Sequence, residues 1–104
     1  MKLQRIKYKW GSALYRISVF RSSKHIYAQV SEIQSGKTLF SSSDLSLKVK
    51  TKNDIEKAQL VGKELAKKIK AKKLGKLVFD RSAYKYHGRV RALAEGIREE
   101  GVKI

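Results

Sequence analysis

The sequence predicts an α/β domain in which a mixed sheet of four strands is combined with two helices. Three observations lead to this prediction. Three segments between residues 15 and 43 alternate apolar and polar side chains, two later segments repeat apolar residues at helical spacing, and a short wholly apolar run lies between those two helices. The predicted order is β-β-β-α-β-α, an antiparallel three-stranded meander followed by one parallel strand. At 104 residues, one globular domain (15–104) after a basic N-terminal arm (1–14) is expected.

The meander is predicted from two-residue periodicity in segments 15–20, 25–31 and 37–43. One face of its first two strands is aliphatic, with Ile17, Val19, Ile26, Ala28 and Val30. The other face is basic, polar and aromatic, with Arg16, Ser18, Phe20, His25, Tyr27 and Gln29. Bases stack on rings and phosphates meet cations, so this second face is a candidate RNA surface. The alternative, which is not exclusive, is that Phe20 and Tyr27 pack on each other across the strands.

The first helix is predicted to start after Asn53, with Glu56 as the capping-box partner. Its apolar stripe comprises Ile55, Ala58, Val61, Gly62, Leu65, Ala66 and Ile69. Lysines crowd its C-terminal half, where cations complement the helix dipole, so part of this run is structural. Gly75 is expected to end the helix.

The run Leu77-Val78-Phe79 is typical of a strand buried on both faces and parallel to a neighbour. The strand–helix–strand spacing supports a right-handed crossover. A last helix follows the loop 80–87, and Gly101 is placed to stop it. Its core stripe comprises Val90, Leu93, Ala94 and Ile97.

The charge of the chain indicates a polyanionic partner. Lys and Arg number 25 against nine acids, a formal net charge of +16, and self-repulsion makes such an imbalance a cost. No acid occurs from Met1 to Ser31, a stretch that includes the arm cations Lys2, Arg5, Lys7 and Lys9. An arm that contacts nucleic acid is favoured over a basic tail that only aids solubility, because Tyr8 and Trp10 lie among the lysines.

The segment Asp80–Arg91 is the richest in candidate contacts. It follows the carboxyl end of the predicted parallel strand and leads into a helix N-terminus, where backbone N–H groups favour an anion such as phosphate. Its candidate RNA-binding residues are Arg81, Tyr84, Lys85, Tyr86, His87, Gly88, Arg89 and Arg91.

Catalysis, zinc binding and membrane binding fit the sequence less well than RNA binding. Asp80 and His87 could form an acid/base pair, but a metal-dependent nuclease normally needs several carboxylates and Asp80 is the only acid between Glu64 and Glu95. With two histidines and no cysteine, a zinc site is not expected. A membrane-surface helix would need large apolar side chains opposite its lysines, whereas residues 54–73 offer small ones. We therefore expect no catalysis, cofactor, small-molecule substrate or membrane partner. We also expect the protein to be cytoplasmic.

Two motifs resemble a known family. Ile17 to Val30 is similar to the first hairpin of the bacterial large-subunit ribosomal protein eighteen family, and Val78–Arg81, Tyr84–Val90 and 92–95 resemble its second signature. The likeness extends in order from about Arg16 to Ile104. The arm departs from the family pattern, since it is short and rich in lysine, and Ser82-Ala83 stand where glycine is common.

The resemblance implies a ribonuclease-H-like sheet without catalytic carboxylates. It also implies binding to 5S rRNA, attachment to the large-subunit (23S-type) rRNA in the central protuberance, and contact with other 5S-associated ribosomal proteins, in a bacterial or organellar ribosome. The RNA-facing positions that it implies in the hairpin are Arg21, Ser22, Ser23, Lys24, His25 and Tyr27, and those in the second motif are Arg81, 84–89 and Arg91. Arg16 and the arm cations complete the candidate set.

Overall fold

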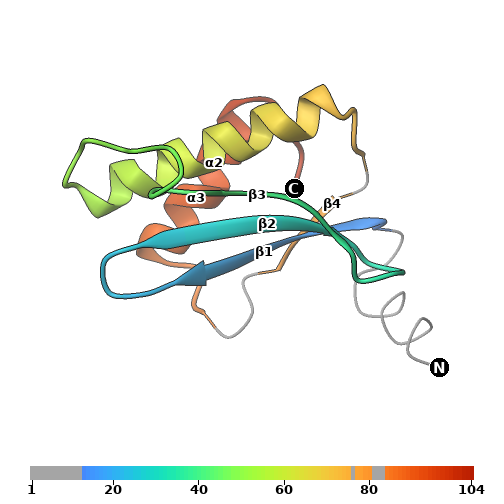
Figure 1. Cartoon of the computed structure of the whole chain (residues 1–104), viewed down its shortest axis with the longest axis horizontal. Helices are drawn as coiled ribbons and strands as arrows, with labels where there is room; N and C mark the ends of the chain where they lie inside the picture. Colours follow the sequence, from blue (N-terminus) through green and yellow to red (C-terminus); the bar gives the residue numbers. More distant parts are fainter. Residues whose placement is uncertain (1–12, 76, 81–83) are drawn as a thin grey trace.

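The first strand occupies the interior of a four-stranded sheet of order β3-β2-β1-β4 (Figure 1). The computed structural model describes residues 13–75, 77–80 and 84–104. Its elements are β1 (Tyr15–Arg21), β2 (Ile26–Glu32), β3 (Thr38–Ser43), α2 (Asp54–Ala71), β4 (Leu77–Asp80) and α3 (Gly88–Glu99). The order is the one predicted from the sequence.

The pairing of the strands confirms the mixed sheet. Strands β1 and β2 are antiparallel, with Ile17 opposite Val30, and β2 and β3 are antiparallel with a register shift after Val30. Strand β4 is parallel to β1 and sets Phe79 beside Ile17. The prediction that β4 is buried on both faces is wrong, since all four of its residues are half-buried. The physical reason is its position, because β4 is at the edge of the sheet that the described residues form and has a neighbouring strand there on one side only.

Both helices lie on the same side of the sheet, as Figure 1 shows. Their apolar stripes cover the aliphatic face, and no helix of the described residues lies on the opposite face. Ser18, which was predicted on that opposite face as part of the RNA surface, is nevertheless buried, at 4% exposure. The fully or almost fully buried core includes Ile17, Val19, Ile26, Val30, Leu65, Ile69, Leu93 and Ile97. The predicted stripe of α3 is therefore confirmed. That of α2 is confirmed except for Ile55, which is exposed at the first turn.

Two glycines allow α2 and α3 to approach closely. A Cβ on Gly62 would overlap the backbone carbonyl oxygen of Leu93, and one on Gly96 would overlap the carbonyl oxygen of Gln59. The two sites are reciprocal, since each glycine faces the backbone of the other helix. Any larger residue at either position would force the helices apart.

The ends of α2 differ in detail from the prediction. Asn53 caps the helix, and its side chain accepts from the amides of Ile55 and Glu56 at 2.9 and 3.1 Å. The capping box is absent, because the Glu56 carboxylate instead accepts from the Thr51 hydroxyl at 2.8 Å. The helix ends at Ala71, before Gly75. Lys73 takes the left-handed conformation (φ 55°), which lets the amide of Leu74 donate to the carbonyl of Ile69.

Candidate nucleic-acid interface

The two segments predicted to bind RNA meet at one end of the sheet. The hydroxyl of Tyr84 accepts from the backbone amide of Arg21 at 3.2 Å and lies 3.4 Å from its carbonyl oxygen. The guanidinium of Arg21 lies over the Tyr84 ring, 4.9 Å from its centroid. The hairpin and the tyrosine-rich loop are 63 residues apart in the sequence. They are therefore parts of one continuous surface, and Tyr84, which is half-buried, fastens them together.

The hairpin end is a tight turn with its cations outside. The amide of Ser22 donates to the carbonyl of His25 at 2.9 Å, and the amide of His25 donates to the Ser22 hydroxyl at 3.2 Å. The Ser22 side chain therefore has a structural role in closing the turn. Ser23 and Lys24 are exposed at its tip. The backbone of the turn is fixed, so it can present Lys24 to a phosphate at a defined position.

A buried acid that the sequence analysis did not single out holds His25. Asp44, directly after β3, has a side chain that is 4% exposed and accepts from Nδ1 of His25 at 2.9 Å and from the amide of Ile26 at 3.2 Å. Burial alone would raise the pKa of Asp44, but the hydrogen bonds from His25 and from the amide of Ile26, together with the electrostatic interactions with His25 and Lys57, outweigh it and hold the pKa below its usual value. A signal was present in the sequence, since Asp44 is the only acid between Glu32 and Asp54.

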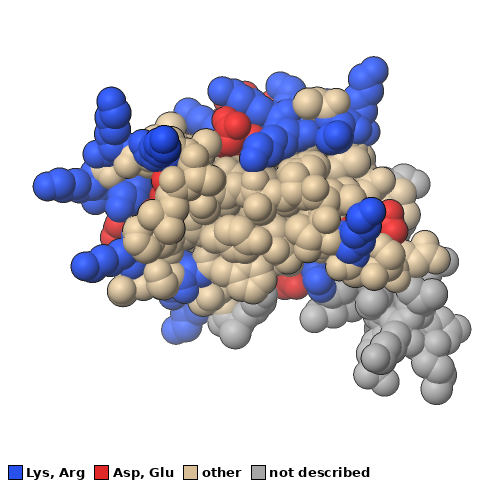
Figure 2. Space-filling view, in the orientation of Figure 1, with Lys and Arg blue, Asp and Glu red and all other residues tan. Residues whose placement is uncertain are grey.

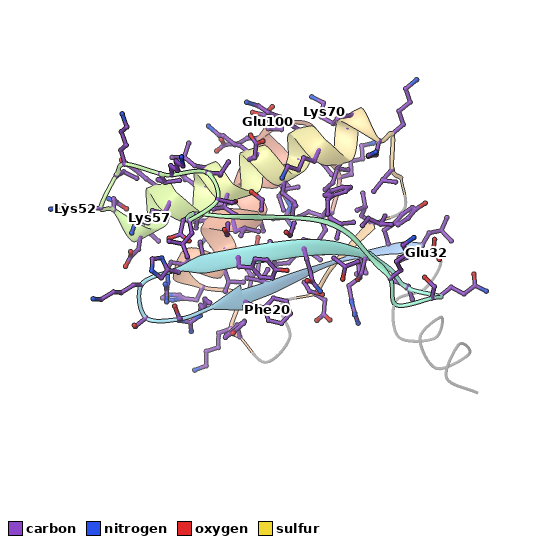
Figure 3. All side chains as sticks on the ribbon, viewed as in Figure 1. Phe20, Glu32, Lys52, Lys57, Lys70 and Glu100 are labelled. Carbon is purple, nitrogen blue, oxygen red and sulfur yellow. The ribbon has the colours of Figure 1, made fainter. Side chains whose placement is uncertain are left out.

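The face of the sheet turned away from the helices has an aromatic pair. Phe20 and Tyr27 are opposite each other in β1 and β2, with ring centroids 5.6 Å apart and planes tilted by 40°. The Tyr27 hydroxyl donates to Gln29 at 2.7 Å. The cross-strand packing weighed from the sequence is thus confirmed. Phe20 nevertheless remains 44% exposed, and Figure 3 shows it projecting on the side opposite the helices.

The tyrosine-rich loop is attached to α3 by Arg98, which the sequence analysis did not identify. The Arg98 guanidinium donates to the Tyr86 hydroxyl at 2.6 Å and lies 5.9 Å from the centre of the ring. Tyr86 is still exposed, as are its neighbours Lys85 and His87. One side of the Tyr86 ring is therefore engaged by the protein, while the loop still presents two cationic or aromatic neighbours to solvent.

The N-termini of the two helices differ in electrostatics. Helix α2 is capped by a side chain and has Asp54 and Glu56 in its first turn. Helix α3 has no side-chain cap hydrogen bond from His87 and no acid in its first turn, which instead contains Arg89 and Arg91. The amides at the start of α3 thus add to the positive potential of two arginines, which favours a phosphate there. Gly88 starts this turn with φ +56°, a conformation that favours glycine.

The lysines of α2 are in part structural, as the sequence analysis expected. Lys68 donates to the carbonyl of Ser41 at 2.7 Å, and Lys70 donates to the carbonyl of Glu100 at 2.9 Å, a contact whose partners are labelled in Figure 3. Lys63 pairs with Glu99 at 3.3 Å. Figure 2 shows further lysines and arginines along α2 and around the hairpin end of the molecule.

Two further candidates, Arg16 and Arg91, lie on β1 and α3. Arg16 is half-buried in β1, and Arg91 is exposed but donates through Nε to Glu95 at 2.8 Å. No cluster of three His, Cys, Asp or Glu side chains suited to a metal lies within residues 13–75, 77–80 and 84–104. The predicted contacts that lie outside the described residues are Lys2, Arg5, Lys7, Lys9 and Arg81.

Comparison with known proteins decides the family. A family model described as ribosomal L18 of archaea, bacteria, mitochondria and chloroplasts matches residues 2–104. The chain belongs to this family. It is 54% identical over 89 residues to large ribosomal subunit protein uL18 of Thermus thermophilus, a match that covers 86% of this chain and 79% of the relative. It is 50% identical over 104 residues to the protein of the same name from Rhodospirillum centenum, a match that covers 96% of this chain and 86% of the relative.

Membership of the L18 family confirms the resemblance that the hairpin and loop motifs indicated. A third relative with the same name, from Lactiplantibacillus plantarum, is 52% identical over 89 residues, with 86% of this chain and 75% of the relative covered. Members of the family are large-subunit ribosomal proteins, so this chain is a ribosomal protein whose partners are ribosomal RNA and ribosomal proteins. Its location is the ribosome. No helix of the described residues is long and apolar enough to cross a membrane.

Proposed function

We propose that this chain binds 5S rRNA and helps attach it to the large-subunit rRNA in the central protuberance, next to other 5S-associated ribosomal proteins. The observation that supports this most is the Arg21–Tyr84 contact, which joins two basic, aromatic motifs into one surface. A scaffold that holds cations and rings at fixed positions suits a folded RNA, whose shape, loops and 2′-hydroxyls are what proteins recognise. The proposed role is structural and involves no catalysis.

The proposed contact surface has three parts. The hairpin supplies Arg21 to His25 with Tyr27, the loop supplies Arg81 and Tyr84 to His87, and the start of α3 supplies Gly88, Arg89 and Arg91. The uncapped N-terminus of α3 supports the third part, since its amides and arginines reinforce one another. Arg16 and the cations of the 1–14 arm extend the surface, and residues 15–104 form the globular unit to which that arm is attached.

Competition gel shifts with the full chain test the proposal. The chain should bind 5S rRNA in preference to an unrelated RNA duplex of equal length. Its affinity should fall by about 0.7–0.9 log units per log unit of salt for each phosphate that it neutralises. Equal binding of the two RNAs at every salt concentration would contradict the proposal, because charge alone would then account for the affinity.

A further inference from the structure

An open hollow of about 360 Å³ lies beside the hairpin end of the sheet. It is lined by parts of β1, β2 and the segment that follows β3, with Phe20, Arg21, His25, Tyr27, Asp44 and Leu45 among its residues. Arg21, His25 and Tyr27 belong to the proposed RNA interface, whereas Phe20, Asp44 and Leu45 have no part in it.

The walls of the hollow expose apolar surface in a strongly basic protein. Phe20 is 44% exposed and Leu45 is 64% exposed, although burying either side chain would be favourable. The Phe20 ring is held in place by Tyr27, whose own hydroxyl is fixed by Gln29. An exposed ring that packs against Tyr27, in a hollow that Arg21 also lines, is an arrangement on which an unpaired base can stack while its phosphate meets a cation.

One edge of the hollow has a polar group with a defined hydrogen-bonding role. Asp44 accepts two hydrogen bonds, and an ionised carboxylate can only accept, so Nδ1 of His25 must be the donor between them. In the neutral ring this leaves Nε2 as an acceptor. No group among the described residues is hydrogen-bonded to Nε2, and the His25 side chain is 47% exposed. Asp44 thereby prepares His25 to accept from a ligand.

We propose that this hollow holds one unstacked nucleotide of the bound RNA. Its base stacks on Phe20 in contact with Leu45, and Nε2 of His25 accepts a hydrogen bond from the nucleotide, from a base amine or the 2′-hydroxyl. Arg21 lies beside the phosphate. The inference rests on the proposed function, which it deepens by naming a base-binding subsite. Asp44 acts through His25 and is a positioning residue.

The first test separates stacking from charge. Phe20→Ala should weaken binding to 5S rRNA by between about 5-fold and about 150-fold, the range for removing one stacked base, without changing the slope of affinity against salt. The matched control is Leu60→Ala, since Leu60 is 43% exposed but lies on α2 away from the hollow, and it should bind like the parent. Circular dichroism checks that both variants are folded.

The second test asks whether Asp44 acts through His25. In Asp44→Asn the new amide can donate to Nδ1, which would turn Nε2 from an acceptor into a donor, so affinity should fall about as far as in His25→Ala. In the His25→Ala background, Asp44→Asn should cost nothing further. An undiminished additional loss in the double variant would show that Asp44 supports the fold alone and would overturn its positioning role.

The third test locates the base. Irradiation of the complex with 5S rRNA at 254 nm followed by mass spectrometry should give a nucleotide adduct on the peptide that contains Phe20. Normal 5S binding by Phe20→Ala, with Arg89→Ala impaired, would overturn this inference and leave the proposed function standing. Loss of 5S preference in the parent chain would instead remove the proposed function itself.

Discussion

The two faces of the sheet are built from the same strands but have opposite properties. On the face under the helices, Ile17, Val19 and Val30 are fully buried and contact the stripes of α2 and α3. On the other face, Phe20 is exposed and Tyr27 is half-buried beside it. Successive residues of a strand point to opposite faces, so Val19 is buried and Phe20 is exposed although the two are neighbours in β1.

This difference separates what stabilises the protein from what is available to a ligand. The buried face supplies the apolar area that offsets chain entropy, and it has no capacity to contact RNA. The open face and its two adjoining loops contribute less to the core, so their cations and rings can be arranged for recognition. Substitutions on the two faces should therefore affect different measurements.

The largest effect is expected from placing a charge under the helices. Val19→Asp would bury a carboxylate in an apolar core, at a cost of about 3–5 kcal/mol or more, which is a large part of the stability of a small domain. Urea unfolding followed by circular dichroism would measure it. The matched control is Phe20→Asp, the next residue on the open face, which should remain folded but bind RNA weakly. Equal stability of the two variants would contradict the assignment of faces.

The contact between the helices gives the next largest effect. Gly62→Ala should destabilise the protein by about 1–3 kcal/mol, because the added methyl group meets the rigid backbone of Leu93. Gly75→Ala is the control, since Gly75 has no positive φ and nothing lies near its Cβ position. Thermal unfolding would compare them. If Gly62→Ala were as stable as Gly75→Ala, the two helices would be free to move apart.

The fold could be predicted from the sequence because its signals are local and periodic. The alternation from Tyr15 onwards and the helical stripe of α3 identified the elements and their buried apolar residues, although Ser18, predicted on the wet face, is buried as well. Two predictions that were wrong, the burial of β4 and the capping box of α2, depend on neighbours in space. The half-burial of β4 follows from its edge position, and the exchange of the Glu56 capping box for a Thr51 contact depends on how the preceding segment turns.

The candidate surface was predicted as a set of residues but not as a geometry. The sequence identified Tyr84, Tyr86 and Arg21 as ring or cation contacts. It could not show that Tyr84 fastens the loop to the hairpin, or that Arg98 holds Tyr86. The role of Asp44 could not be predicted for the same reason, because Asp44 contacts His25 only when β3 is paired with β2. Contacts between segments distant in the chain have no periodic signal.

On the open side, an arginine at the start of α3 should matter for binding and not for stability. Arg89→Ala should weaken 5S rRNA binding by about 1–3 kcal/mol, since charge-assisted contacts to phosphate are strong. The slope of log affinity against log salt concentration should become shallower by the amount expected for about one phosphate. Arg91→Ala is the comparison, and a smaller loss of affinity is expected because the Arg91 guanidinium already donates a hydrogen bond to Glu95. Filter binding at several salt concentrations measures both, and an unchanged slope in Arg89→Ala would exclude a phosphate contact.

The smallest effect on stability is expected at Asp44, which accepts hydrogen bonds from His25 and Ile26 at the hairpin end of the sheet. Since its pKa is lowered in the folded protein, Asp44 adds stability that is present above its unfolded pKa of about 3.9 and is lost as the pH falls through the folded value. Asp44→Asn should therefore cost about 1 kcal/mol at pH 7, where the charged acceptor of His25 and Ile26 is lost, and the difference from the parent should disappear at acidic pH.

Chemical denaturation of the parent and of Asp44→Asn between pH 2 and pH 7 would measure this difference. Glu99→Gln is the control, because its ion pair with Lys63 is exposed on both sides and should contribute almost nothing at any pH. A gap between Asp44→Asn and the parent that stayed constant down to pH 2 would mean that the shape of the side chain matters and its charge does not. Packing, as on the face under the helices, would then stabilise the hairpin end, and the charge of Asp44 would not.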